Sequence, residues 1–134
     1  MTQFVSDTHA VHWHLTDDPN LSPIARAVFE EADRGLHQVF VPGIVLIEMV
    51  YLVERGRLAP EPVERMLALV GASDGSFALA GLDQGTARAL HQVPRSAVPE
   101  MPDRIILATA LQLGLPLISR DEAIRRAAVV PVIW

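Results

Sequence analysis

Cysteine and lysine are both absent from this 134-residue chain, and it contains no apolar run long enough to cross a membrane. Without cysteine the chain can form neither a disulfide framework nor a thiolate metal site, so we expect a reducing, cytoplasmic location. A membrane-spanning helix needs roughly 20 apolar residues, so we expect no membrane span. Asp7 also interrupts the N-terminus before the apolar segment of a signal peptide could form, so none is expected.

The charge balance is acidic. Eleven basic residues, all of them arginine, face 16 acidic residues, and the formal net charge is −5. Such a chain is a poor electrostatic partner for nucleic acid, because that affinity comes largely from neutralised phosphates. An acidic chain can still bind nucleic acid if several acids gather at one site and hold cations, since the ions then reverse the local field.

Short segments with the pattern of strands alternate along the chain with segments that have the pattern of helices. The length of the chain, residues 1–134, is that of one domain. Alternating strands and helices predict parallel βαβ units and an open α/β sheet. The expected strands cover residues 3–6, 38–41, 77–82, 115–119 and 129–133. Expected helices cover residues 8–15, 23 to about 35, 44–53, 60–70, 83–93, 104–113 and 122–128, with a proline-containing loop at 94–102.

Three aspartates stand at positions where strands end or helices begin. Asp7 and Asp121 follow predicted strands, and Asp103 follows the loop 94–102. Taken singly, each is most simply explained as a helix N-cap. Taken together, they can meet at the carboxyl edge of a parallel sheet, where ligands bind. Three crowded carboxylates repel one another unless a cation lies between them, and Mg²⁺ or Mn²⁺ prefers such hard oxygen ligands.

Glu48 is the fourth acid, and a capping role does not explain it. It lies in the middle of the predicted helix 44–53, among apolar residues three and four positions away. A carboxylate buried there without a partner would cost several kcal/mol. It therefore either joins the other acids, emerges at the rim, or pairs with an arginine such as Arg104 or Arg120.

The acids lie in short motifs whose order is informative. The motifs are VSDTHA at residues 5–10, VLIE at 45–48, VERGRL at 53–58, PDRIILATA at 102–110 and LPLISRD at 115–121. In this order and spacing they resemble the PIN domain, and within it the VapC-type toxins of bacterial toxin–antitoxin pairs, over essentially the whole chain. The resemblance implies a PIN-like three-layer α/β/α sandwich with a central parallel sheet.

The resemblance also implies a site and a function. Asp7, Glu48, Asp103 and Asp121 would be the acidic quartet that holds Mg²⁺ or Mn²⁺ and carries catalysis. Thr8 and Ser119 match positions where a hydroxyl supports the site, and Glu100 stands where the family often has an aspartate. Residues 101–102 depart from the commoner proline–aromatic pair. The implied activity is that of an endoribonuclease toxin, which cleaves structured RNA such as tRNA or rRNA and is silenced by a cognate antitoxin.

Other interpretations remain open at this stage. His9, His12 and His14 could form a zinc site, but the pattern supplies no convincing third ligand, and structural roles are simpler. A phosphatase or DNase could use the same acids, although phosphoaspartate phosphatases usually carry a second aspartate where His9 stands. A degenerate PIN-like binding module is the alternative from another class. Trp13 and Tyr51 could stack on bases and several arginines could contact phosphate, namely Arg55, Arg57, Arg95, Arg104, Arg120, Arg125 and Arg126.

Two segments carry more apolar surface than a small domain is able to bury. They are residues 45–53 and 62–70. An exposed apolar patch of this kind suits a subunit interface, so we expect a homodimer. We also expect the tail of the antitoxin to occupy the acidic groove, with an arginine directed at the carboxylates.

Overall fold

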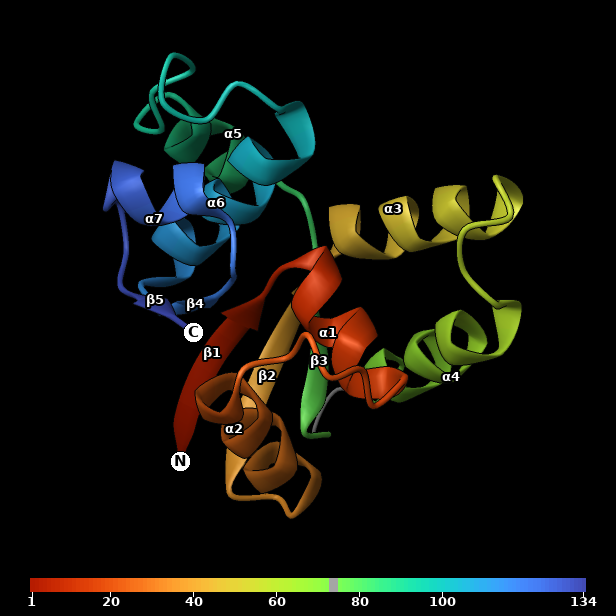
Figure 1. The fold of residues 1–134 in the computed structure, drawn as a ribbon. Coiled ribbons are helices and arrows are strands. Elements are labelled where there is room, and N and C mark those ends of the chain that lie inside the picture. The colour runs from red at the N-terminus through yellow and green to blue at the C-terminus, as the bar shows by residue number, and fades with distance from the viewer. Residues whose placement is uncertain (73–74) are drawn as a thin grey trace.

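A parallel five-stranded sheet forms the centre of the molecule, as seen in a computed structural model that describes residues 1–72 and 75–134. The strand order is β3-β2-β1-β4-β5, so the chain builds outward from β1 first in one direction and then in the other (Figure 1). All strand pairs are parallel, which confirms the expected sheet. The strands are β1 (Thr2–Ser6), β2 (His37–Pro42), β3 (Phe77–Ala80), β4 (Leu117–Ile118) and β5 (Val132–Ile133).

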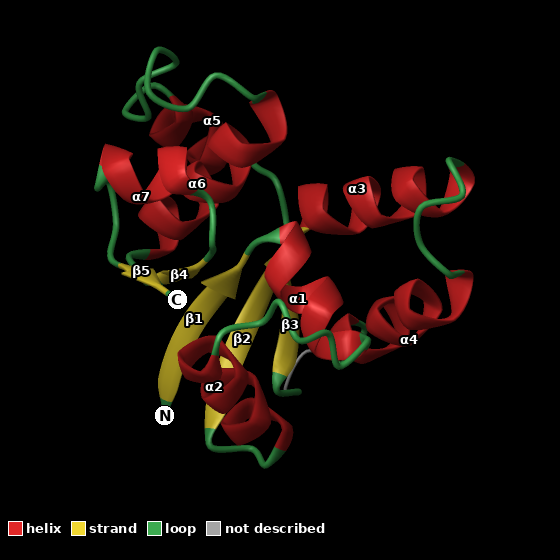
Figure 2. Ribbon diagram, viewed as in Figure 1, coloured by secondary structure: helices red, strands yellow, loops and turns green. Residues whose placement is uncertain are grey.

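Helices connect the strands and cover the sheet (Figure 2). Because crossovers between parallel strands are right-handed, this strand order places the first four helices on one face and the last three on the other. This arrangement is the expected three-layer α/β/α sandwich. The helices are α1 (Thr8–Leu15), α2 (Pro23–Asp33), α3 (Gly43–Glu54), α4 (Pro60–Val70), α5 (Gln84–Leu90), α6 (Met101–Leu113) and α7 (Glu122–Ala127).

Local sequence explains where several of these helices begin. Ser22 caps α2, because its hydroxyl oxygen accepts a hydrogen bond from the Ala25 N–H at 3.1 Å, and Pro23 occupies the first helical position. Asp83 caps α5 in the same way and forms a capping box with Thr86. The helices α1, α2 and α4 begin at residues 8, 23 and 60, as predicted.

The core consists of apolar side chains from the sheet and both helical layers. Val39 and Val41 of β2 are fully buried, as are Phe29 of α2, Met49 of α3 and Leu107 of α6. The opposite sides of α3 and α4 remain exposed, with Tyr51 the most exposed of their apolar residues at 62%. No helix in the described residues is long and apolar enough to cross a membrane.

The last third of the chain differs in detail from its predicted elements. The loop was expected to reach residue 102, but α6 already begins at Met101, so Asp103 lies in its first turn rather than in a loop. Pro102 does not break the helix there, because a proline in the first turn lacks only an N–H that would have no partner anyway. The predicted strands 115–119 and 129–133 shrink to two residues each, since only these residues pair with a neighbouring strand.

Candidate metal-dependent active site

The acids gather where the strand order reverses. Strands β1 and β4 are neighbours, yet the chain leaves them toward opposite faces of the sheet, which makes their carboxyl ends a typical ligand-binding position in open α/β folds. Asp7 follows β1, and its N–H donates to the Ile118 carbonyl at 3.1 Å. Asp121 follows β4 after two residues. Figure 1 shows α1 starting at this end of β1, with α3 on one side and α6 and α7 on the other.

Asp7 is both a helix cap and a buried acid. Its Oδ1 accepts a hydrogen bond from the Ala10 N–H at 2.9 Å, and the residue is only 6% exposed. Burial raises the pKa of Asp7, while hydrogen bonding from Ser119 and from the Ala10 N–H acts in the opposite direction. The cap interpretation is therefore confirmed for Asp7, and its role in a metal site stays a prediction.

Asp121 caps α7 and is tied to Ser119. Its Oδ1 accepts from the Ile124 N–H at 2.9 Å, and its own N–H donates to Ser119 Oγ at 3.1 Å. Ser119 is fully buried between Asp7 and Asp121 in these contacts. The expected supporting role of Ser119 thus has a structural basis, namely that one hydroxyl contacts two of the four acids.

Glu48 points from α3 toward the start of α1. Its Oε1 accepts a hydrogen bond from Thr8 Oγ1 at 2.6 Å. The alternative pairing with Arg104 is wrong, because the Arg104 guanidinium donates to the carbonyls of Leu90 and Val93 at 3.0 and 2.9 Å. Thr8 therefore holds the side chain of Glu48, a contact consistent with the supporting role predicted for Thr8.

Asp103 lies in the middle of the acids. Its pKa is raised to about 6, first by burial and then by the negative charges of Asp121, Glu48 and Asp7, with Glu100 contributing least. Four elements thus bring four carboxylates into mutual electrostatic range. Glu100 occupies the N-cap position of α6, is exposed, and makes no capping hydrogen bond.

Two adjoining cavities open on either side of the acids, and both are lined by Asp7, His9 and Asp103. The larger has a volume of about 350 Å³ and extends toward α7. The smaller, of about 250 Å³, extends toward α3 and the residues that follow it. The larger is also lined by Trp13, Arg120, Asp121 and Glu122, and the smaller by Thr8, Glu48, Leu52 and Arg57.

The donor set fits a hard divalent cation that keeps part of its water shell. Carboxylate oxygens are the ligands that Mg²⁺ and Mn²⁺ prefer, and the repulsion that raises the pKa of Asp103 is what a cation between the acids would relieve. In residues 1–72 and 75–134, no group of three or more His, Asp or Glu side chains is already placed to hold a metal ion. A hydrogen bond occupies one oxygen on each of Asp7, Glu48 and Asp121. Each carboxylate therefore offers fewer oxygens to an ion, and water would complete the coordination.

The histidines of α1 have separate roles. His14 pairs with Asp33 at 3.0 Å and stacks on Phe29 at 4.7 Å between ring centroids, which ties α1 to α2. Burial and the neighbouring His9 lower the pKa of His12. The ion pair and the ring stacking give His14 the structural role that was the simpler interpretation.

One arrangement in the larger cavity was not predicted from the sequence. The Arg120 guanidinium carbon lies 4.8 Å from the centroid of the Trp13 ring. Trp134 and His9 contact the same indole, with ring centroids at 5.9 and 5.4 Å. Trp13 and Arg120 are 107 positions apart, and the pairing of β1 with β4 brings them together. The local sequence pattern around either residue does not indicate this contact.

Comparison with known proteins identifies the class to which this fold and site correspond. Residues 4–130 match the PIN domain family, and the chain belongs to it. Ribonuclease VapC22 of Mycobacterium tuberculosis is 29% identical over 125 residues, which cover 93% of this chain and 92% of that protein.

Solved structures give the same fold. VapBC from Salmonella typhimurium in complex with DNA matches with a TM-score of 0.69 at 20% identity, over 98% of this chain and 97% of the other. VapBC2 from Rickettsia felis, bound to a promoter DNA fragment, matches with a TM-score of 0.71 at 10% identity over the same shares. At these identities the similarity establishes the architecture alone.

Proposed function

We propose that the protein is a metal-dependent endoribonuclease and the toxin of a toxin–antitoxin pair. The observation that carries the proposal is the convergence of Asp7, Glu48, Asp103 and Asp121 from four separate elements on one cavity pair. Membership of the PIN family and similarity to a protein named a ribonuclease support the activity. We further propose structured RNA, either tRNA or rRNA, as the substrate and the cytoplasm as its location.

The proposed reaction is hydrolysis of a phosphodiester bond. Asp7 and Asp103 are the principal ligands for Mg²⁺ or Mn²⁺, and Glu48 and Asp121 complete the set. Such an ion, when bound, lowers the pKa of water and polarises the phosphate. Thr8 fixes one oxygen of Glu48 by its 2.6 Å hydrogen bond, which orients this carboxylate to accept a proton from the attacking water. Ser119 positions Asp121 through the backbone instead, because its Oγ accepts a hydrogen bond from the Asp121 N–H.

An antitoxin is the partner that we propose for the site. Two of the similar solved structures are VapBC proteins bound to DNA. An acidic groove attracts a basic segment, and an arginine can form two parallel hydrogen bonds with one carboxylate. We therefore propose that a tail of the antitoxin inserts an arginine among the four acids and blocks access of RNA.

A cleavage assay with matched aspartate variants tests the proposal. Asp7→Asn keeps the helix cap, because asparagine also accepts the Ala10 N–H, but it removes a ligand charge. We expect Mn²⁺-dependent cleavage of a folded RNA by the wild type, none after chelation, and a loss of at least a hundredfold in Asp7→Asn. Asp83→Asn, which changes a capping aspartate of α5 outside the site, should leave the rate unchanged.

The rival functions give different results in the same assay. Cleavage of DNA but not RNA would indicate a DNase, and release of phosphate from a monoester would indicate a phosphatase. A folded protein that binds no Mn²⁺ and cleaves nothing would indicate a binding module. Equal activity of Asp7→Asn and Asp83→Asn would contradict the proposed site.

A further inference from the structure

The Arg120–Trp13 pair lines the larger cavity together with His9 and four acids, Asp7, Asp103, Asp121 and Glu122. Trp13 is part of α1, while Arg120 immediately follows the buried Ser119 at the end of β4. Trp13 thus lies on the helix that Asp7 caps, and Arg120 lies in the short connection between β4 and α7, directly before Asp121. Any ligand group that contacts this pair is thereby placed close to the four acids.

The Arg120 guanidinium is exposed and is not used for ion pairing. It stands next to Asp121 and Glu122 in the chain, yet the ion pairs of the described residues join other groups. The cation lies over the indole face of Trp13 instead. The guanidinium carbon lies over the ring, and the residue as a whole is exposed and lines the cavity.

Packing alone explains Trp13 but not Arg120. Trp13 is partly buried and packs against the core, and Trp134 contacts it at 5.9 Å, so an indole here is a normal part of the fold. Arg120 adds little to that packing because it is exposed. What the indole supplies to Arg120 is orientation, since stacking fixes the plane of a side chain that otherwise samples many rotamers.

We propose that the Arg120–Trp13 pair is a nucleobase-binding subsite for a nucleotide adjacent to the scissile phosphate, an inference that rests on the proposed ribonuclease function. An unstacked RNA base stacks on the open face of the Arg120 guanidinium and extends the column that Trp13 begins. Unpaired bases in RNA are commonly bound on aromatic rings and on arginine planes in this way. A cavity of about 350 Å³ falls in the range of sites that hold small organic ligands.

The subsite predicts a dependence on the base that a simple phosphate contact does not. Stacking needs both the planar guanidinium and a base, whereas a phosphate contact needs only positive charge. Two probes separate these cases, an adenosine hexamer and a hexamer with the same phosphates that carries abasic spacers. Binding is measured by fluorescence anisotropy in Mn²⁺ with Asp103→Asn as the common background, so that the RNA stays intact.

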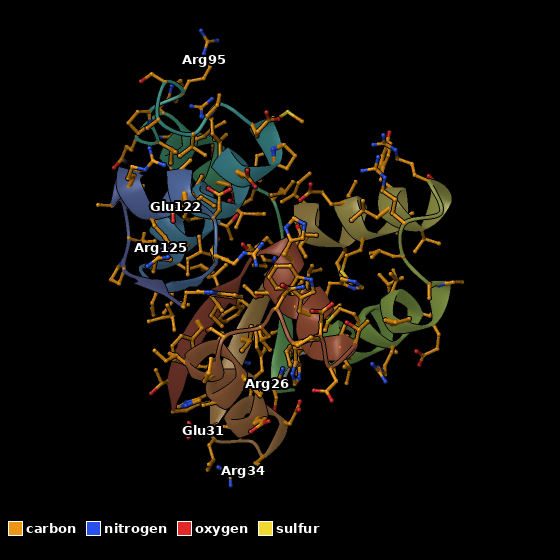
Figure 3. The ribbon with its side chains drawn as sticks, viewed as in Figure 1. Arg26, Glu31, Arg34, Arg95, Glu122 and Arg125 are labelled. Carbon is orange, nitrogen blue, oxygen red and sulfur yellow. The ribbon has the colours of Figure 1, made fainter. Side chains whose placement is uncertain are left out.

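We expect Arg120→Ala in this background to weaken binding of the adenosine hexamer by about tenfold, as for one lost base stack, and to leave binding of the spacer hexamer nearly unchanged. Arg120→Lys should resemble Arg120→Ala, because it keeps the charge but loses the plane. Trp13→Leu should also reduce the preference for adenosine, and circular dichroism reports whether this variant folds. Arg95→Ala is the control, an exposed arginine far from α1 on the outer loop of Figure 3.

Equal weakening of both hexamers in Arg120→Ala, or restored binding in Arg120→Lys, would overturn the subsite in favour of a charge contact. The same loss in Arg95→Ala would overturn it as well. Wild-type cleavage of RNA is measured in parallel, so that the two proposals can fail separately. Cleavage without the adenosine preference overturns the subsite alone, and the preference without cleavage overturns the ribonuclease alone. If neither occurs, both are overturned.

Discussion

Asp103 is one of two site residues, with Asp7, whose pKa the fold raises. An aspartate in an unfolded chain titrates near 3.9, whereas in the folded protein the pKa of Asp103 is raised to about 6 by burial and by the other acids. The folded state therefore binds this proton more tightly than the unfolded state does. As the pH rises from about 4 to above 6, the ionised carboxylate increasingly destabilises the metal-free fold.

Asp103→Asn should accordingly raise the melting temperature of the metal-free protein at pH 8 and change it little at pH 4. Calorimetry in the presence of a chelator measures both values. Glu100→Gln is the control, because Glu100 is exposed and contributes least to the shift. The same melting-temperature change at both pH values would show that crowding of the acids is not its cause.

Thr8 offers a second test at the scale of one hydrogen bond. Its hydroxyl holds Glu48 at 2.6 Å, and hydrogen bonds that orient metal ligands typically contribute 10–100-fold to metal affinity. Thr8→Val should weaken Mn²⁺ binding by roughly tenfold in isothermal titration calorimetry, while Thr8→Ser keeps the hydroxyl and should bind as the wild type does. Unchanged affinity in Thr8→Val would separate Glu48 from the metal site.

At the scale of elements, helix caps divide into those that only start a helix and those that also belong to the site. Ser22 caps α2 away from the acids, and Asp121 caps α7 beside them. Ser22→Ala should lower the free energy of unfolding by about 1 kcal/mol without slowing RNA cleavage. Asp121→Asn should retain the cap and the stability but cleave more slowly. Denaturant unfolding and cleavage rates together test this division, and a matching loss of stability in both variants would contradict it.

The sequence predicted the elements well where a local signal marks their ends. Ser22 with Pro23 marks the start of α2, and α1 and α4 have the predicted bounds of residues 8–15 and 60–70. The start of α6 was predicted three residues too late, with Asp103 as its cap, because three prolines in residues 94–102 suggest irregular structure. Glu100 occupies the N-cap position instead, and Pro102 is compatible with a first helical turn.

Long-range contacts were beyond such signals. The hydrogen bond between Thr8 and Glu48 joins residues 40 positions apart. The Arg104 guanidinium donates to the carbonyls of Leu90 and Val93, 14 and 11 positions earlier in the chain. The choice between a buried acid that joins the site and one that pairs with an arginine depends on these contacts. Residue periodicity cannot provide them, because it reports only the face of an element and not its neighbour.

At the scale of the whole molecule, an exposed apolar surface covers parts of α3 and α4. It consists of Ile47, Val50, Tyr51, Leu67 and Leu69, each at least 38% exposed. Patches of this kind typically mark interaction sites, so the homodimer expected from the sequence stays a prediction with a defined surface.

Light scattering at micromolar concentration should give twice the chain mass of 14.6 kDa for the wild type. Tyr51→Asp should shift the mass toward the monomer, because it places a charge in the patch. Leu79→Asp is the control, since Leu79 is comparably exposed at 49% but lies on β3. A monomeric wild type would count against the dimer and leave the patch to the antitoxin.

The most direct test of the account is to map new 5′ ends in total RNA from the host after incubation with the protein. The wild type with Mn²⁺ is compared with the wild type in chelator and with Asp103→Asn in Mn²⁺. We expect discrete new ends in one or a few structured RNAs, seen only when both the ion and Asp103 are present. New ends that persist in Asp103→Asn or in chelator would contradict it, because the four acids would then not be the centre that cleaves RNA.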